Sequence, residues 1–384
     1  MVLTRARYLA PFLVALAVFP EACTRQASSR PPETAAAREL QVAPFWPKPL
    51  PDNWMLGNVV GISIDSHDNV WVTHRPNSIQ YAAKTPPVLE FDQAGSLLQS
   101  WGGPGPGFEW GTQVHGVYID YKDNVWIGFG GGLPYDPTKN FTTDNALVLK
   151  FTPQGKFLLQ IGAFGKGREG SNSPQYLGNP TDVYVDPRTD EAFISDGYIN
   201  HRVIVFDANT GAYKRHWGAY GKRPDDSVIP PQGTAPAAIR DLSKDPPAQF
   251  ETPHCVKSSN DGLLYVCDRQ NTRIQVFRKD GTFVKEAFIR AQAGEGTAPV
   301  RPGDIALSRD PEQSLMYVVD MLNGKVVTLR RETLETVATF GHRGRNAGDL
   351  LTPHSLALDS KGNLFVTETT DGSRLQKFTL SPGR

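Results

Sequence analysis

Residues 254–277 read HCVKSSNDGLLYVCDRQNTRIQVF. Side chains alternate in character over the first six residues, and Asp261-Gly262 then provides a turn. The apolar runs Leu264–Cys267 and Arg273–Phe277 follow, separated by a second polar turn. Runs with a period of two that are joined by such turns are typical of β-hairpins. The stretch therefore predicts three successive antiparallel strands.

The same unit occurs six times along the chain. The six copies begin at Val60, His115, Thr181, His254, Gly303 and His354. Their starts are 49 to 73 residues apart, and a fourth strand can be placed in the first five copies. Periods of this length with four strands per unit are typical of propeller blades. We therefore predict an all-β, six-bladed β-propeller with four antiparallel strands per blade.

The sixth copy ends after its third strand, which would leave the edge of one sheet unpaired. The stretch from Glu39 to Trp46 lies just before the first copy and carries an apolar pattern. We predict that it pairs with the last blade and closes the ring, because this removes an exposed sheet edge.

The composition fits a turn-rich β protein. The 384 residues include 36 glycines and 31 prolines, and Lys plus Arg equal Asp plus Glu at 40 each. A chain without net charge creates no field that favours a polyanion. We therefore expect no nucleic-acid partner and no electrostatic binding to an anionic membrane.

The first residues have the layout of a secretory signal. Arg5 and Arg7 precede an apolar stretch from Tyr8 to Phe19, which is too short to span a bilayer as a stable helix. We expect residues 1–22 to be the signal peptide and the protein to be exported, to the periplasm or beyond.

The next residues suggest a tether. The segment from Thr24 to Arg38 is rich in Ser, Pro, Ala and Arg, so we expect residues 23–38 to be disordered and residues 39–384 to form the propeller. Ala22-Cys23 leaves two alternatives, lipid attachment at Cys23 or ordinary cleavage nearby. We expect a monomer whose only membrane attachment would be that lipid.

Two further cysteines, Cys255 and Cys267, lie on neighbouring predicted strands of one blade. They could form a disulfide, or they could be two small buried apolar side chains. Two cysteines do not make a disulfide scaffold, so packing must hold the core together.

Histidine opens every second repeat. His115, His254 and His354 are the starts of the second, fourth and sixth copies. In a six-fold ring, equivalent positions on alternate blades lie about 120° apart and face the same end of the channel. Three imidazoles with a fourth position left open are the pattern of a catalytic zinc site. The alternative is hydrogen-bonded histidines at a channel rim, but their shared position favours a metal.

A second group of residues is expected at the same mouth. The loop that enters the first strand of a blade and the loop that leaves the second lie on one face, which places Arg75, Tyr198 and Arg269 beside the histidines. Arginine can clamp a carboxylate, and a phenol near a dication can act as a base. The structural alternatives are a surface charge for Arg75, a turn cap for Tyr198 and an ion pair for Arg269.

Two sets of motifs resemble known families. The Asn200-His-Arg202 and Asn271-Thr-Arg273 turns, each with an aspartate upstream, resemble the NHL repeat, which occurs in binding scaffolds as well as in enzymes. The chain also resembles peptidylglycine α-hydroxyglycine amidating lyase, or peptidylamidoglycolate lyase. The motifs that carry this second resemblance are Val-His115-Gly, Pro-His254-Cys, Pro-His354-Ser, Asp-Gly-Tyr198, Asp-Arg269-Gln and His-Arg75.

The resemblance to the lyase implies a role for each of the six numbered residues of these motifs. The three histidines would bind zinc, Tyr198 would be the base, and Arg75 and Arg269 would hold the substrate carboxylate. The implied reaction splits an N-acyl- or peptidyl-α-hydroxyglycine into a primary amide and glyoxylate. In the animal enzymes an aspartate after the third histidine helps to hold a structural calcium. This chain has Ser355 there, which puts that calcium in doubt.

We expect a small anionic N-acyl-α-hydroxyglycine or a peptide as substrate. Two other functions compete with the zinc lyase. One is a non-catalytic NHL propeller that binds a peptide or polysaccharide at the same mouth. The other is a calcium-dependent, lactonase-like hydrolase, but the channels of such enzymes are lined with carboxylates and asparagine, and three imidazoles argue against it.

Overall fold

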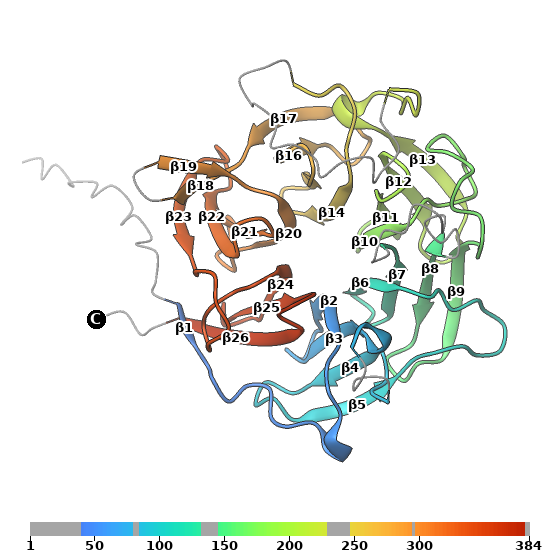
Figure 1. Ribbon diagram of the computed structural model, residues 1–384. Coiled ribbons are helices and arrows are strands. Elements are labelled where there is room, and N and C mark those ends of the chain that lie inside the picture. The colour runs from blue at the N-terminus through green and yellow to red at the C-terminus, as the bar shows by residue number, and fades with distance from the viewer. Residues whose placement is uncertain (1–39, 80–83, 132–144, 229–245, 294–295, 381–384) are drawn as a thin grey trace, which may run out of the picture. The chain divides into compact units, whose positions relative to one another are not determined.

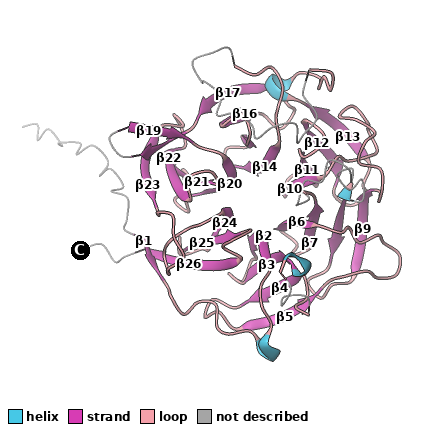
Figure 2. Cartoon of the chain, in the orientation of Figure 1, coloured by secondary structure: helices cyan, strands magenta, loops and turns pink. Residues whose placement is uncertain are grey.

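The protein is described by a computed structural model. It covers residues 40–79, 84–131, 145–228, 246–293 and 296–380. Over these residues the chain forms six four-stranded antiparallel sheets, arranged as blades around a central axis (Figure 1). Strands joined by loops make up nearly all of the fold, with only short helical turns between them (Figure 2). The predicted six-bladed β-propeller is confirmed.

The first three blades follow one another in chain order, innermost strand first. Blade one contains β2 (Asn58–Ile64), β3 (Val70–Arg75), β4 (Val88–Phe91) and β5 (Leu97–Trp101). Blade two contains β6 (Val114–Ile119), β7 (Val125–Phe129), β8 (Leu147–Phe151) and β9 (Phe157–Gly162). Blade three contains β10 (Pro180–Asp186), β11 (Glu191–Asp196), β12 (Arg202–Asp207) and β13 (Tyr213–Trp217).

The remaining blades repeat the pattern. Blade four contains β14 (Pro253–Ser258), β15 (Leu264–Asp268), β16 (Arg273–Phe277) and β17 (Phe283–Phe288). Blade five contains β20 (Pro302–Leu307), β21 (Leu315–Asp320), β22 (Lys325–Arg330) and β23 (Thr336–Phe340). Blade six contains β24 (Pro353–Leu358), β25 (Leu364–Glu368), β26 (Arg374–Leu380) and, as its outer strand, β1 (Leu40–Val42).

A few shorter elements lie outside the four-stranded sheets. The hairpin of β18 (Arg290–Ala293) and β19 (Gly296–Pro299) connects blades four and five and was not predicted from the sequence. Among the described residues, the 3₁₀ turn η1 (Pro51–Asn53) precedes blade one and η5 (Ala219–Gly221) follows blade three, whereas η2 (Pro76–Ser78) lies within blade one between β3 and β4.

The N-terminal strand closes the ring, as predicted. β1 pairs antiparallel with β26, with Leu40 opposite Leu380 and Val42 opposite Phe378. The last blade thus takes three strands from the C-terminal end of the chain and one from the N-terminal side. This pairing covers the outer edge of β26 and joins both ends of the propeller to one sheet.

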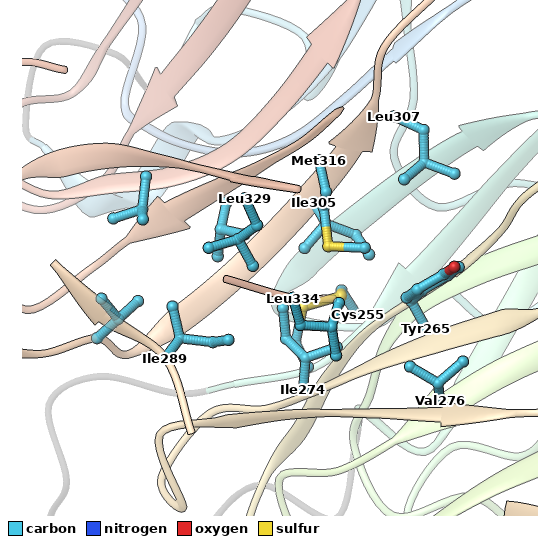
Figure 3. Close-up of a cluster of buried hydrophobic side chains, with 14 of the residues drawn as sticks. Cys255, Tyr265, Ile274, Val276, Ile289, Ile305, Leu307, Met316, Leu329 and Leu334 are labelled. Carbon is cyan, nitrogen blue, oxygen red and sulfur yellow. A yellow bond between two sulfur atoms is a disulfide. The ribbon is translucent and has the colours of Figure 1, made fainter. Parts of the chain in front are cut away.

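Apolar side chains pack between neighbouring blades. The described core forms six clusters, and each joins two adjacent blades around the ring. Between blades four and five, Cys255 and Tyr265 pack with Ile305 and Met316 (Figure 3). Each blade therefore buries both faces, which is why second and third strands such as β7 and β8 are buried along their whole length.

The two cysteines of blade four form a disulfide. Cys255 and Cys267 lie directly opposite each other on β14 and β15, with a Cα–Cα distance of 4.9 Å. Of the two alternatives that the sequence left open, the structure has the disulfide. It joins the strand that carries His254 to the strand that ends beside Arg269.

The predicted signal peptide, Cys23 and the tether lie outside the described residues. Within the described part of the chain, no helix has both the length and the apolar character that crossing a membrane requires.

Candidate metal centre

The three histidines occupy equivalent places in β6, β14 and β24, the innermost strands of alternate blades. The prediction that they begin their strands is wrong by one residue, because Val114, Pro253 and Pro353 precede them in the sheets. The pairing register with the second strand of the blade shifts at each histidine. Such a bulge removes a residue from the regular ladder and re-aims its side chain. It accounts for three side chains that leave their sheets and point toward one another.

The imidazoles form one compact cluster. The ring centroids of His115 and His254 are 4.9 Å apart, those of His115 and His354 are 4.9 Å apart, and those of His254 and His354 are 5.0 Å apart. One ring nitrogen of each lies within 4.8 Å of the corresponding atoms of the other two. All three residues are buried. The spatial arrangement inferred from the repeat is therefore present, and a single ion could contact all three rings.

Hydrogen bonds to backbone carbonyls of the next blade fix the orientation of the rings, directly for His115 and His254 and through Ser355 for His354. Nδ1 of His115 lies 2.8 Å from the Thr181 carbonyl, and Nδ1 of His254 lies 2.6 Å from the Gly303 carbonyl. Nδ1 of His354 lies 3.2 Å from the Ser355 hydroxyl, which itself donates to the Val60 carbonyl at 3.0 Å. A carbonyl can only accept, and the Ser355 hydroxyl already donates its proton to Val60. The three Nδ1 atoms therefore carry the proton, and each Nε2 keeps its lone pair. This arrangement is typical of metal-binding histidines.

The surroundings keep the three rings neutral. Burial lowers the pKa of His354 to about 3, and the positive charges of Arg75 and Arg269 act in the same direction. Burial, followed by neighbouring charges, also holds the pKa values of His115 and His254 well below the usual range. Neutral imidazoles can donate their lone pairs to a cation, so the chemistry of the cluster fits a divalent metal.

The hydroxyl of Tyr198 lies at the edge of this cluster. It is 3.2 Å from Nε2 of His115 and 3.4 Å from Nε2 of His254. Nη1 of Arg269 donates to the same hydroxyl at 3.2 Å, and the guanidinium carbon lies 5.1 Å from the centre of the phenol ring. Tyr198 and Arg269 are thus beside the histidines, as the sequence predicted.

Arg75, the last residue of β3, reaches the same mouth from blade one. Its Nε donates to the Val114 carbonyl at 3.0 Å and its Nη2 to the Gly130 carbonyl at 2.9 Å. Gly131 separates this guanidinium from Tyr198. A Cβ atom added there would be 2.9 Å from Nη2 of Arg75 and 3.4 Å from the phenol ring. Sequence reasoning missed Gly131, whose only local signal is its place in a run of glycines.

Buried ion pairs hold the turns that present Tyr198 and Arg269. Asp196 receives a hydrogen bond from Nε of Arg202 at 2.9 Å, and both side chains are fully buried. In blade four Asp268 receives the same bond from Arg273 at 2.7 Å, again without exposure. Each aspartate is the last residue of the second strand of its blade, and the turn that carries Tyr198 or Arg269 follows directly. The aspartates and arginines of the NHL-like motifs therefore position the site.

Gly197 lets the Tyr198 turn pack directly on blade four. A Cβ atom at this position would lie 1.9 Å from the Pro253 carbonyl oxygen, just before His254. We predict that Gly197→Ala lowers the free energy of unfolding by about 1–3 kcal/mol, since the backbone must move apart. It should also slow the reaction proposed below by about a hundredfold, because misplacing a catalytic group by about 1 Å has such an effect. Metal affinity should also fall, since the Pro253 backbone that the added methyl group displaces directly precedes His254.

Gly128→Ala is the matched control. A Cβ atom there would be 3.5 Å from the Pro180 carbonyl oxygen, an ordinary contact between blades. Melting curves and turnover numbers of the two variants give the comparison. Equal effects of the two substitutions would show that the position of the Tyr198 turn does not matter.

The residues of the channel do not fit the calcium that the family resemblance raised. Ser355, which replaces the expected aspartate, donates its hydroxyl to the Val60 carbonyl at 3.0 Å. The channel pocket is bordered by only two carboxylates of the described residues, Asp182 and Asp304. Both contact the ammonium group of Lys257. A hard dication needs several free oxygen ligands, and these carboxylates already have a cation.

Comparisons with known proteins agree with the motifs. The sequence pattern of the NHL repeat family matches residues 250–277. The mouse peptidyl-glycine alpha-amidating monooxygenase is 25% identical over 92% of this chain, which spans 33% of that protein. The Drosophila melanogaster peptidyl-alpha-hydroxyglycine alpha-amidating lyase 1 is 26% identical over 87% of this chain and 58% of its own length. Homologues thus include amidating lyases.

Homologues also include proteins named only for the repeat. The mouse NHL repeat-containing protein 3 is 28% identical over 87% of this chain and 82% of its own length. Among solved structures, a streptogramin B lyase has a TM-score of 0.52 at 13% identity and covers 89% of this chain and 98% of its own. This structural similarity concerns the fold alone.

Proposed function

We propose that the protein is a zinc-dependent lyase that cleaves the carbon–nitrogen bond of an N-acyl- or peptidyl-α-hydroxyglycine, with a primary amide and glyoxylate as products. One observation carries the proposal: the hydroxyl of Tyr198 is within 3.4 Å of the Nε2 atoms of two neutral histidines in a cluster of three. A base, a metal site and two arginines then meet at one mouth of the channel. Homologues named as amidating lyases support the same class of reaction.

The zinc would be held by the Nε2 atoms of His115, His254 and His354. Bound zinc would supply a Lewis acid that polarises the substrate hydroxyl oxygen and lowers the pKa of that hydroxyl group. Three protein ligands are the number that catalytic zinc sites use. The carbonyls of Thr181 and Gly303 and the hydroxyl of Ser355 keep the three rings in the orientation that binding needs.

The arginines would bind and orient the substrate carboxylate. Arg75 uses Nε and Nη2 for backbone carbonyls, so the rest of its guanidinium group can donate to an anion. Arg269 donates to the Tyr198 hydroxyl through Nη1. A carboxylate held between these groups would place the neighbouring carbon, with its hydroxyl, beside the phenol oxygen.

Tyr198 would move the proton. In its deprotonated form it takes the proton from the substrate hydroxyl, and the oxygen–hydrogen electron pair becomes the second bond of the glyoxylate carbonyl. The carbon–nitrogen bond breaks, and its electron pair leaves with the amide nitrogen. That nitrogen then takes the proton from Tyr198, which restores the base. One substrate gives one amide and one glyoxylate, without water or a redox partner.

We also propose that the protein works outside the cytoplasm as a monomer. The Cys255–Cys267 disulfide supports an oxidising compartment. The secretory pattern of residues 1–22 supports the same location, and any membrane attachment would be through a lipid at Cys23. The formal net charge of zero supports a small anionic substrate or a peptide over nucleic acid.

The proposal is tested on the purified protein. Bound metal is measured by elemental analysis, and glyoxylate release is followed with a simple N-acyl-α-hydroxyglycine against the spontaneous rate. We expect about one zinc per chain and glyoxylate formation that stops on removal of the metal and returns with zinc. Zinc without glyoxylate formation above background would refute the lyase. No stoichiometric metal would refute the metal centre and leave a binding propeller.

A further inference from the structure

A partly buried lysine, Lys257, contacts two of the residues that line the channel pocket beside the histidine cluster. The Nζ atom of Lys257 is 2.6 Å from Asp182 and 3.3 Å from Asp304, and the two carboxylate side chains are 8% and 7% exposed. All six innermost strands border the channel pocket here, and the pocket is lined by His115 and His254 together with both aspartates. The ammonium group of Lys257 is therefore held by two carboxylates that line the same pocket as two of the three histidines.

The charges of this group depend on one another. Burial alone would lower the pKa of Lys257, but Asp182 and Asp304 raise it above its usual value. Burial raises the pKa of Asp304, and the positive charge of Lys257 opposes that rise. Removal of the ammonium would leave two buried carboxylates without a counter-ion, which is strongly unfavourable.

The two aspartates directly follow the residues that orient two of the histidines. Asp182 comes after Thr181, whose carbonyl accepts from His115, and Asp304 comes after Gly303, whose carbonyl accepts from His254. Lys257 itself is on β14, three residues after His254. Pulling both carboxylates toward one ammonium therefore sets the spacing of β10, β14 and β20 at the level of the metal site.

Further hydrogen bonds extend this network between the inner strands. Asp182 accepts from the Val256 N–H at 3.0 Å, which joins β10 to β14. Asp304 accepts from the Leu356 N–H at 3.3 Å, which joins β20 to β24, the strand of His354. The network thus includes the strands of two metal-binding histidines and the two strands whose carbonyls orient His115 and His254.

We propose that Lys257 is a positioning residue for the metal centre, a tethered cation that holds Asp182 and Asp304 together so that the three imidazoles converge before a metal binds. This role rests on the metal site of the proposed function but not on its lyase chemistry. Residues that orient metal ligands contribute about 10–100-fold to affinity.

The test compares two lysines that each lie close to a buried aspartate. Lys257→Met removes the tethered cation. Lys150→Met is the control, because Lys150 is buried, donates to the Ala208 carbonyl at 3.0 Å and lies 3.9 Å from Asp120, on β8 away from the channel. Zinc affinity is measured by competition with a chelator, and the visible absorption of the cobalt-substituted protein reports the ligand geometry.

We expect Lys257→Met to bind zinc about tenfold or more weakly and to change the cobalt spectrum. Lys150→Met should lower the melting temperature and leave zinc affinity and the cobalt spectrum as in the wild type. A folded Lys257→Met protein with wild-type zinc affinity and spectrum would overturn the inference, because a purely structural lysine would act on stability alone.

A second variant covers the case in which Lys257→Met does not fold. The triple variant Asp182→Asn, Lys257→Met, Asp304→Asn carries no uncompensated charge, so it should fold, yet it lacks the attraction that draws the strands together. We expect the same loss of zinc affinity, and a wild-type affinity would again overturn the role. A wild-type protein that binds no zinc would refute the metal centre itself. A wild-type protein that binds zinc but has no lyase activity would refute only the proposed reaction.

Discussion

Replacement of His254 by alanine should lower zinc affinity by more than about a hundredfold, since removal of a group that merely orients a ligand already weakens binding by about 10–100-fold. Glyoxylate formation should fall to the spontaneous rate. The imidazole supplies one of the three nitrogens of the cluster, and the Gly303 carbonyl that orients it would lose its partner. Titration with zinc against a competing chelator, followed by the glyoxylate assay, measures both effects.

His74→Ala provides the control for this experiment. His74 is as buried as the cluster, and burial lowers its pKa to about 4. Its ring accepts from the Gly57 N–H at 3.1 Å and lies 2.9 Å from the Pro86 carbonyl, so its role is structural. The variant should be less stable but should bind zinc normally. If both histidine variants keep wild-type zinc affinity, the three rings do not form the metal site.

Replacement of Tyr198 by phenylalanine should lower kcat by about 10²–10⁴-fold, the range that a positioned base contributes. Zinc affinity should stay close to that of the wild type, because the phenol is not among the three nitrogen ligands. KM should change little, since the arginines that would hold the substrate carboxylate remain. Steady-state kinetics together with metal analysis separate these effects.

Tyr213→Phe is the matched control, since Tyr213 also places its hydroxyl on a histidine, 2.8 Å from Nδ1 of His216, but on the outer strand β13. Its turnover number should equal that of the wild type. A Tyr198→Phe protein with a wild-type turnover number would mean that another group takes the proton, even if the metal site were intact.

Much of the fold could be predicted from the sequence because its determinants are local and repeated. The alternation of apolar side chains and the turn residues between them recur in every blade, so six weak signals reinforce one another. The closing strand could be predicted because the sixth copy has no outer strand of its own and another segment had to supply one. The β18–β19 hairpin could not, because its short, glycine-containing segment lacks that apolar pattern.

The candidate site was predictable for a related reason. The repeat converts positions in the chain into positions around an axis, so three histidines at the same place in alternate copies must meet. The bulges at the inner strand ends were not visible in the sequence, because they are deviations of pairing register rather than of residue type. Because these bulges were not predicted, each histidine was predicted to be the first residue of its strand, one residue after the observed start.

Contacts between blades were the main part that sequence reasoning missed. Lys257 reads as an ordinary polar residue of an alternating strand, and nothing near it in the chain indicates the two aspartates, which lie 75 positions before it and 47 positions after it. The role of Gly131 could not be predicted for the same reason, since Arg75 and Tyr198, which it separates, come from blades one and three. Such contacts depend on how the blades face one another, which periodicity alone does not specify.

The convergence of three imidazoles on one ion is the central claim, and anomalous diffraction from crystals of the zinc-loaded protein tests it most directly. Data collected on either side of the zinc absorption edge should give one peak, about 2.0–2.1 Å from Nε2 of His115, His254 and His354, that vanishes below the edge. Zinc located elsewhere in the chain, with no peak among these three nitrogens, would contradict the claim.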